Sequence, residues 1–98
     1  MKKYNDESLT GLVVLKFTAE WCAPCKRLNP ILQKLSEETP EVTFYEVDVD
    51  EMPTLSDTYK VKSVPTLVFL KEGVEIKRHV GLSLIDPLRK VLREMRDE

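Results

Sequence analysis

The 98-residue sequence has only two cysteines, one histidine and no marked excess of charge of either sign. Its 15 lysines and arginines and 17 acidic residues leave a formal net charge of −2. A protein that binds nucleic acid through phosphate contacts needs a basic excess or stripe, so this balance argues against one. No apolar run approaches the ~18–20 residues that a membrane-spanning helix requires. We therefore expect neither a nucleic acid nor a membrane as a partner.

The scarcity of cysteine also limits what Cys22 and Cys25 can do. A disulfide that closes only two intervening residues removes little entropy from the unfolded chain, so it is a poor structural crosslink. Two thiols are too few for structural zinc, which usually takes four ligands, and the single histidine, His79, lies far along the chain. We expect no metal site. Thiol–disulfide chemistry is the remaining interpretation.

The first residues of the chain do not resemble a signal peptide. Lys2 and Lys3 are followed by acidic residues where a signal peptide has an apolar segment, so we expect a cytoplasmic protein. With 42% apolar and 33% charged residues in mixed order, the composition is that of a folded chain, and the length suits one domain spanning residues 1–98. The pattern shows no apolar surface patch, which favours a monomer.

Strands and helices are expected to alternate along the chain. The run 12–17 is apolar and rich in branched residues, which is typical of a strand buried on both faces. A series of leucine and isoleucine at i, i+3, i+4 and i+7 predicts a helix from the cysteines to about residue 39. Further strands are predicted at 43–49, 66–70 and 74–80, a short helix at 51–59, and a last helix with apolar residues between 84 and 95.

This order of elements predicts an α/β fold with helices on both faces of a mixed sheet. A strand–helix–strand opening requires parallel strands, and Gly73 offers a turn with positive φ before an antiparallel edge strand. We favour a sheet of four strands; the alternative is a vestigial fifth strand at 2–4, followed by one helical turn at 6–9. Alternation along 74–80 predicts Val74, Ile76 and Val80 on one face and Glu75, Lys77 and His79 on the other.

Cys22 and Cys25 lie where the first long strand ends and the first helix begins. The free N–H groups and the positive dipole end of a helix N-terminus favour a thiolate, and the thiolate is the nucleophile. Cys22 would attack a substrate disulfide, and Cys25 would then attack the mixed disulfide and release the reduced substrate. Pro24 stiffens the loop that holds the two sulfurs together. A C-x-x-C pattern alone is weak evidence, but one between a strand and a helix is much stronger.

The segment Ala19-Glu20-Trp21-Cys22-Ala23-Pro24-Cys25-Lys26, with Pro30 inside the following helix, resembles the active-site segment of the thioredoxin family. Val64-Pro65-Thr66 is similar to the family's cis-proline segment, and Lys71-Glu72-Gly73 and Val80-Gly81 match its later glycine positions. The resemblance covers about residues 12–92. It implies a thioredoxin-like, three-layer α/β/α sandwich.

The resemblance also implies an enzyme. It would be a protein-disulfide reductase that is recharged by a thioredoxin-reductase-type electron donor and needs no cofactor beyond its Cys22–Cys25 disulfide. Pro65 would be cis and face that disulfide, where it helps to exclude metal, and the backbone of Val64 would pair with an extended substrate. The other residues expected to contact substrate are Trp21, Ala23, Pro24, Val49, Val80, Gly81 and Leu82.

Three positions depart from the family pattern. Ala23 stands where many relatives have glycine, and we expect only a modest effect on the reduction potential. Lys16 occupies a strand position where the family usually has a buried acid, and Glu46 stands where it usually has a lysine. These reversed signs predict a swapped ion pair in which Glu46 is the general base and the Lys16 ammonium favours the thiolate. In the alternative interpretation, Lys16 extends to the end of its strand and Glu46 is exposed.

Three functions are compatible with these residues. The favoured one is the reduction of protein disulfides in the cytoplasm. A disulfide oxidase or isomerase on the same fold would require a secretory setting, of which the sequence shows no sign. A redox-independent binding module would use the groove around Trp21 and Pro65.

Overall fold

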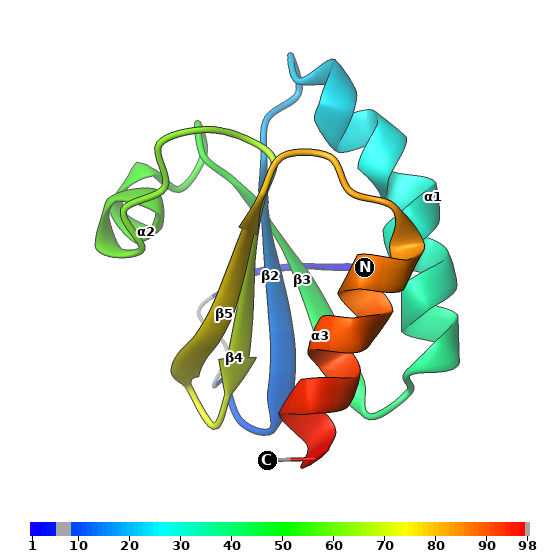
Figure 1. Cartoon of the computed structure of the whole chain (residues 1–98). Helices are drawn as coiled ribbons and strands as arrows, with labels where there is room; N and C mark the ends of the chain where they lie inside the picture. Colours follow the sequence, from blue (N-terminus) through cyan, green and yellow to red (C-terminus); the bar gives the residue numbers. More distant parts are fainter. Residues whose placement is uncertain (6–8, 98) are drawn as a thin grey trace.

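The computed structural model describes residues 1–5 and 9–97, and within them one mixed sheet has the strand order β1-β3-β2-β4-β5. The strands are β1 (Lys2–Lys3), β2 (Leu12–Thr18), β3 (Val42–Asp48), β4 (Thr66–Lys71) and β5 (Val74–Val80), and the helices are α1 (Ala23–Glu38), α2 (Pro53–Thr58) and α3 (Ile85–Asp97). Figure 1 shows α1 and α3 on one face of the sheet and α2 on the other. None of the described helices is long and apolar enough to cross a membrane.

The sheet has a fifth strand, so the favoured number of four was wrong. β1 pairs in parallel with β3, through Lys2 with Tyr45 and Lys3 with Glu46. A strand of two residues is too short to show alternation, so the sequence pattern carries little sign of it. Most of the helical turn expected at 6–9 lies outside the described residues, and the remaining residue, Leu9, is not helical.

Strand β2 lies at the centre of the sheet, parallel to β3 and antiparallel to β4. Residues 13–19 are all buried, as expected for a strand covered on both faces. Val14 packs in one apolar cluster with the inward face of α1 and with α3, whereas Val13 and Leu15 belong to a second cluster on the α2 side. Because side chains alternate along a strand, Lys16 faces the same side as Val14, towards α1.

Strands β4 and β5 form a hairpin with the two-residue turn Glu72-Gly73. Both residues have positive φ, 50° and 80°, which is the geometry that favours two-residue hairpins. The turn predicted at Gly73 is therefore confirmed. A register shift follows, because Leu70 pairs with Glu75 while the adjacent Phe69 pairs with Lys77. This β-bulge puts Glu75 and Lys77 on opposite faces, so the predicted charged face of β5 was wrong.

Three connections meet at one end of the sheet: β2 to α1, α2 to β4, and β5 to α3 (Figure 1). The cysteines lie in the first of these connections and at the start of α1. Segments from three separate parts of the chain therefore surround them.

The fold predicts that the inward face of α1 contributes strongly to stability. Leu32 is 1% exposed in the core under α1. We expect Leu32→Ala to lower the free energy of unfolding by about 2–5 kcal/mol, because the packed surroundings leave a cavity. Lys34→Ala, on the exposed face of the same helix, should change it by less than about 0.5 kcal/mol. Urea unfolding followed by circular dichroism compares the two, and equal losses would contradict this orientation of α1.

Candidate active site

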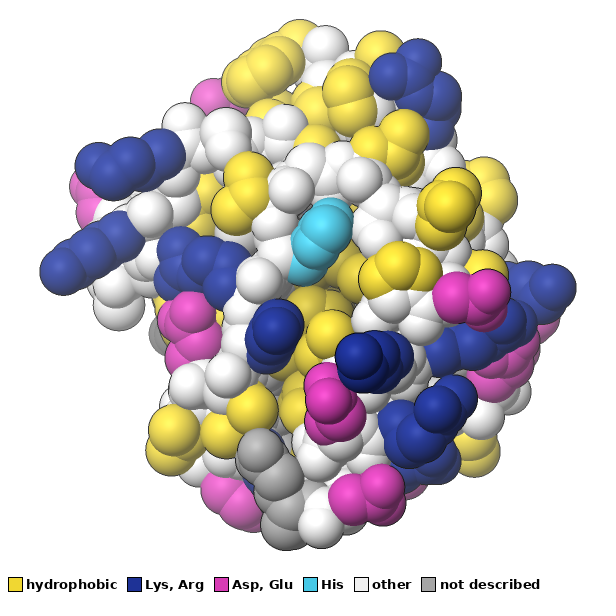
Figure 2. Space-filling view, viewed as in Figure 1, with side chains coloured by type: hydrophobic (Ala, Val, Ile, Leu, Met, Phe, Trp, Pro, Cys, Tyr) yellow, Lys and Arg dark blue, Asp and Glu magenta, His cyan; other side chains and the backbone are white. Residues whose placement is uncertain are grey.

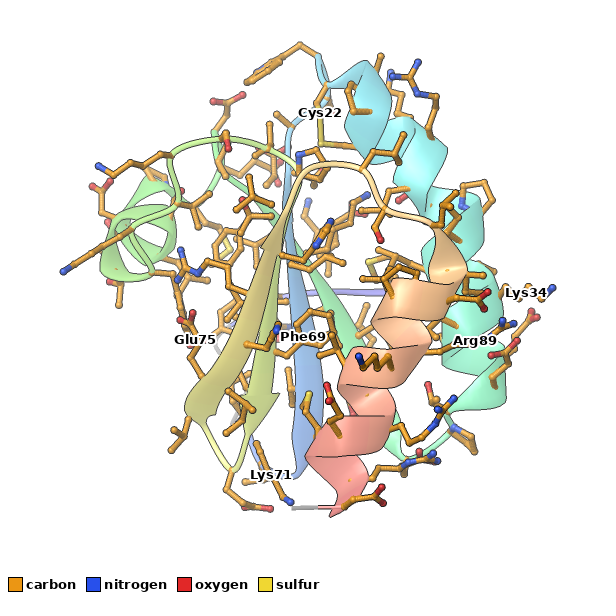
Figure 3. All side chains as sticks on the ribbon, viewed as in Figure 1. Cys22, Lys34, Phe69, Lys71, Glu75 and Arg89 are labelled. Carbon is orange, nitrogen blue, oxygen red and sulfur yellow. A yellow bond between two sulfur atoms is a disulfide. The ribbon has the colours of Figure 1, made fainter. Side chains whose placement is uncertain are left out.

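Cys22 and Cys25 form a disulfide at the N-terminus of α1 (Figure 3). Cys22 is the N-cap residue, and its Sγ accepts a hydrogen bond from the backbone N–H of Cys25 at 3.2 Å. Pro24 occupies the first helical turn, where its missing N–H removes no helical hydrogen bond. Once the disulfide is reduced, the helix N-terminus stabilises negative charge on the Cys22 sulfur.

Both cysteines are buried against a small apolar cluster. They share it with Ala19, and Val49 and Val64 pack against it. The backbone N–H of Val49 donates to the carbonyl of Thr18 at 2.9 Å, which holds the end of β3 beside the end of β2. Two of the residues predicted to contact substrate, Val49 and Val64, are thus placed directly at the disulfide.

Pro65 is buried, and the Val64–Pro65 peptide bond is cis. The carbonyl of Pro65 accepts a hydrogen bond from the backbone N–H of Gly81 at 2.8 Å. Gly81 has a φ of 94°, which favours glycine, and a Cβ added there would meet no heavy atom within 4 Å. The backbone at Gly81 is therefore open to an approaching chain, and the exposed side chains of Val80 and Leu82 flank it.

Trp21 is 71% exposed, far more than a tryptophan that serves only the core. Its Nε1–H donates to Oδ2 of Asp50 at 2.9 Å. The loop that carries Asp50 is fixed in turn by Asp48, whose Oδ1 accepts from the backbone N–H groups of Asp50 and Glu51 at 2.8 and 3.2 Å. Sequence reasoning missed Asp50; the acidic turn directly after a predicted strand was the available signal.

An apolar surface surrounds the disulfide at this end of the molecule, so the expectation of a surface without an apolar patch was wrong. A depression of about 160 Å³ lies beside Trp21 and is lined by Val49, Ser56, Val61, Lys62, Ser63 and Val64. Hydrophobic side chains gather at the same end in Figure 2. Among the exposed large hydrophobic residues, Trp21, Val80, Leu82 and Leu84 lie in or next to the connections at this end. Ala23 and Pro24 lie in the first turn of α1 beside this surface.

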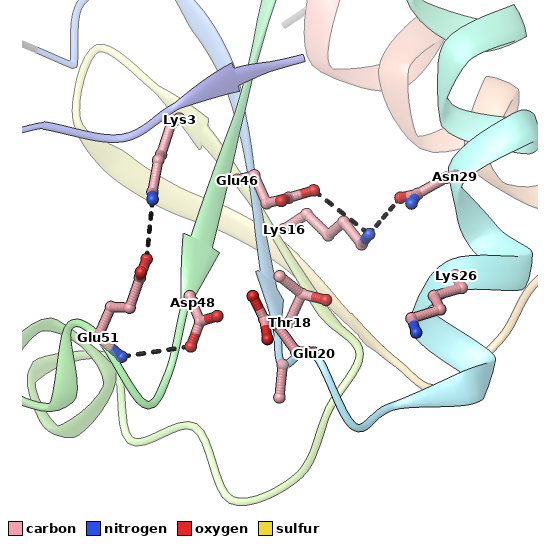
Figure 4. A pocket seen from close by; sticks show the side chains of 10 residues that line it. Lys3, Lys16, Thr18, Glu20, Lys26, Asn29, Glu46, Asp48 and Glu51 are labelled. Carbon is pink, nitrogen blue, oxygen red and sulfur yellow. Dashed lines mark hydrogen bonds and ion pairs between the residues drawn. The ribbon is translucent and has the colours of Figure 1, made fainter.

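Lys16 is a buried cation on β2, the strand that ends before the cysteines. Its side chain is 1% exposed, and its Nζ lies 3.6 Å from Oε2 of Glu46, the residue opposite it on β3. The same Nζ donates to Oδ1 of Asn29 on α1 (Figure 4). Burial lowers the pKa of Lys16, and the carboxylate of Glu46 opposes that shift.

The two interpretations of Lys16 each hold in part. The predicted ion pair is present, and Lys16 does not reach solvent. Glu46, however, has a side chain that is 41% exposed, so only one partner is buried. Sequence reasoning missed Asn29, although a polar residue four positions after Cys25 lies on the same side of the helix and was a usable signal.

A polar hollow of about 250 Å³ opens beside Lys16 (Figure 4). Besides Lys16 and Asn29, it is lined by Lys3, Thr18, Ala19, Glu20, Lys26, Glu46, Asp48 and Glu51. Lys3 of β1 forms an ion pair with Glu51 at 3.0 Å. Within residues 1–5 and 9–97, no three histidine, cysteine or acidic side chains are grouped so that they could hold a metal ion.

Comparison with known proteins gives consistent matches. The Thioredoxin family model matches residues 2–94. The chain is 44% identical over 91 residues to a thioredoxin of Chlamydia trachomatis serovar D, which covers 93% of this chain and 89% of that protein. It is 46% identical over 81 residues to an H-type thioredoxin of Ricinus communis, covering 83% and 67% respectively. The X-ray structure of Fasciola hepatica thioredoxin has a TM-score of 0.81 at 38% identity, covering 87% of this chain and 81% of that one.

A reactive cysteine pair at the start of a helix, on this sheet, defines a thiol–disulfide oxidoreductase. The chain belongs to the thioredoxin family. The three-layer α/β/α sandwich expected from the sequence is confirmed, and the Cys22–Cys25 disulfide is its redox-active pair.

The burial of Lys16 predicts a gain of stability when its charge is removed. Because burial lowers its folded-state pKa below 10.5, the cost of folding a charged Lys16 is fully present at any pH below that folded-state pKa. That cost decreases as the pH rises towards 10.5, because the folded chain releases the proton first. We expect Lys16→Met to raise the free energy of unfolding at pH 7, because methionine fills a similar volume without a buried charge and Glu46 keeps access to water.

Urea unfolding at several pH values measures this gain, with Lys34→Met as the control on an exposed face. The advantage of Lys16→Met should shrink with rising pH, and that of the control should stay near zero. A Lys16→Met chain that is less stable than the parent at pH 7 would contradict the assigned cost of burial.

Proposed function

We propose that the protein reduces protein disulfides by dithiol–disulfide exchange. The observation that carries this proposal is the position of Cys22, which caps α1 directly after the exposed Trp21, at the end of the sheet where the backbone of Gly81 is open. A reactive sulfur at a helix N-terminus, surrounded by apolar surface and free backbone, suits an extended polypeptide substrate. The setting we propose is the cytoplasm, with a thioredoxin-reductase-type enzyme as the electron donor.

The exchange proceeds in two balanced steps. The Cys22 thiolate attacks one sulfur of the substrate disulfide, forms a mixed disulfide and releases the other substrate sulfur as a thiolate, which takes up a proton. The Cys25 thiolate then attacks the Cys22 sulfur, forms the Cys22–Cys25 bond and releases the second substrate sulfur, which is also protonated. Two electrons pass from the dithiol to the substrate, and the donor enzyme returns them.

Substrate recognition in this proposal uses backbone and apolar contacts. The backbone at Val64, before the cis peptide bond, pairs with an extended substrate segment, and Gly81 leaves room for that segment on the other side. Trp21 and Val49 contact substrate side chains, and the bond from Trp21 to Asp50 holds the indole ring in place before substrate arrives.

The reducing direction is supported by the two residues between the cysteines. Ala23 and Pro24 resemble the reducing members of the family more than the histidine-containing pairs of its oxidants. Equilibration of the Cys22–Cys25 pair with glutathione measures the direction: a potential well below the glutathione value supports a reductase, and one at or above it favours the oxidase or isomerase alternative.

The two cysteines should fail in different ways when replaced. With dithiothreitol as electron source and insulin as the disulfide substrate, Cys22→Ser should abolish catalysis, because no thiolate starts the exchange. Cys25→Ser should stop turnover but accumulate a mixed disulfide, which mass spectrometry detects. A Cys22→Ser, Cys25→Ser chain that retained full biological activity would instead favour the binding module.

We propose that Lys16 and Glu46 assist the ionisation of the cysteines. In this role the Lys16 ammonium favours a thiolate, and Glu46, which faces the hollow, accepts the proton of Cys25 through water. We expect Glu46→Gln to slow disulfide reduction several-fold near neutral pH and to lose this effect at higher pH, where Cys25 ionises unaided. A pH–rate profile identical to that of the parent chain would remove Glu46 from the mechanism.

A further inference from the structure

Asn29 connects the buried ammonium of Lys16 to the helix that carries the cysteines. Lys16 reaches across from β2, and its Nζ donates to the side-chain oxygen of Asn29 (Figure 4). Asn29 follows Cys25 by four residues in α1, and side chains with that spacing are neighbours, with Cβ atoms about 5–6 Å apart. The ammonium is thus bonded to a residue one helical turn along α1 from the buried Cys25.

The charges around Lys16 show why a neutral partner matters. The other charged groups that line the hollow are Glu20, Lys26 of α1, Glu46 and Asp48 of β3, Lys3 of β1, and Glu51. Among the described residues, the one carboxylate within ion-pair distance of Nζ is that of Glu46, at 3.6 Å and on the side of β3. On the side of α1, the amide oxygen of Asn29 fixes the position of the ammonium without cancelling its charge.

We propose that Asn29 is a positioning residue that holds the Lys16 ammonium near Cys25, so that the second step of the exchange depends on this charge more than the first. The inference rests on the proposed dithiol exchange. In that second step the Cys25 thiol gives its proton through water to Glu46, and its thiolate displaces the substrate sulfur from Cys22. The ammonium takes no part in bond making; its field stabilises the Cys25 thiolate.

The experiment measures both steps in one reaction. The reduced chain is mixed with insulin, quenched with acid at successive times, and the mixed disulfide and the oxidised chain are quantified by mass spectrometry. Asn29→Ala should slow the second step about tenfold relative to the first at pH 7, as expected for a tenfold smaller fraction of Cys25 thiolate. The mixed disulfide should therefore accumulate in Asn29→Ala. At high pH its second step should become as fast as that of the parent chain.

Two further variants separate charge from structure. Asn29→Asp keeps the shape and the acceptor oxygen but adds a carboxylate that cancels the ammonium, so it should slow the second step at least as much as Asn29→Ala. Gln33→Ala removes an exposed amide one turn further along α1, whose side chain bonds only Glu37 in the described contacts, and should behave as the parent chain.

The outcomes distinguish this inference from the proposed function. Equal slowing of both steps by Asn29→Ala, or a second step in Asn29→Asp as fast as in the parent, would show that Asn29 is only structural and would overturn the inference. In either case the mixed disulfide still forms and the reductase proposal stands. A parent chain that forms no mixed disulfide at all would overturn both.

Discussion

Strand β2 is buried on both faces and hydrogen-bonded along both edges, and the positions of the other elements follow from that constraint. Its alternating side chains divide the core into one cluster under α1 and α3 and another towards α2. Because β2 ends directly before the cysteines, the same strand sets where α1 begins. The reactive sulfur therefore follows a strand buried on both faces, and its surroundings are supplied by loops.

Those loops turn a local motif into a binding site. Val49, Val64 and Gly81 belong to three different connections, and short backbone hydrogen bonds tie each connection to its neighbours near the disulfide. The hydrogen bond from Trp21 to Asp50 adds a further link at the edge of the site. An exposed apolar surface of this kind is held open by polar contacts at its edges, which reduces the entropy lost when a substrate binds.

The burial of Lys16 lowers the stability of the fold, and we propose that it also serves the chemistry of the cysteines. A lysine with almost no exposed surface costs free energy, because neither Asn29 nor the half-exposed Glu46 fully replaces its lost hydration. In the role we propose, that cost has a counterpart, because a buried positive charge acts more strongly on a nearby sulfur than one in water.

Features that depend on neighbours in sequence were predictable, and those that depend on partners distant in sequence were not. The buried strand, the cysteines at the start of α1 and the turn at Gly73 follow from periodicity, helix-terminus chemistry and backbone conformation, which are local. The tertiary structure alone decided that Asn29 binds Lys16, 13 residues away, and that Asp50 binds Trp21, 29 residues away. It also decided the β-bulge that places Glu75 and Lys77 of β5 on opposite faces of the sheet. Hydrogen-bond partners and strand register are settled only when packed elements meet, because several partners satisfy the same local pattern.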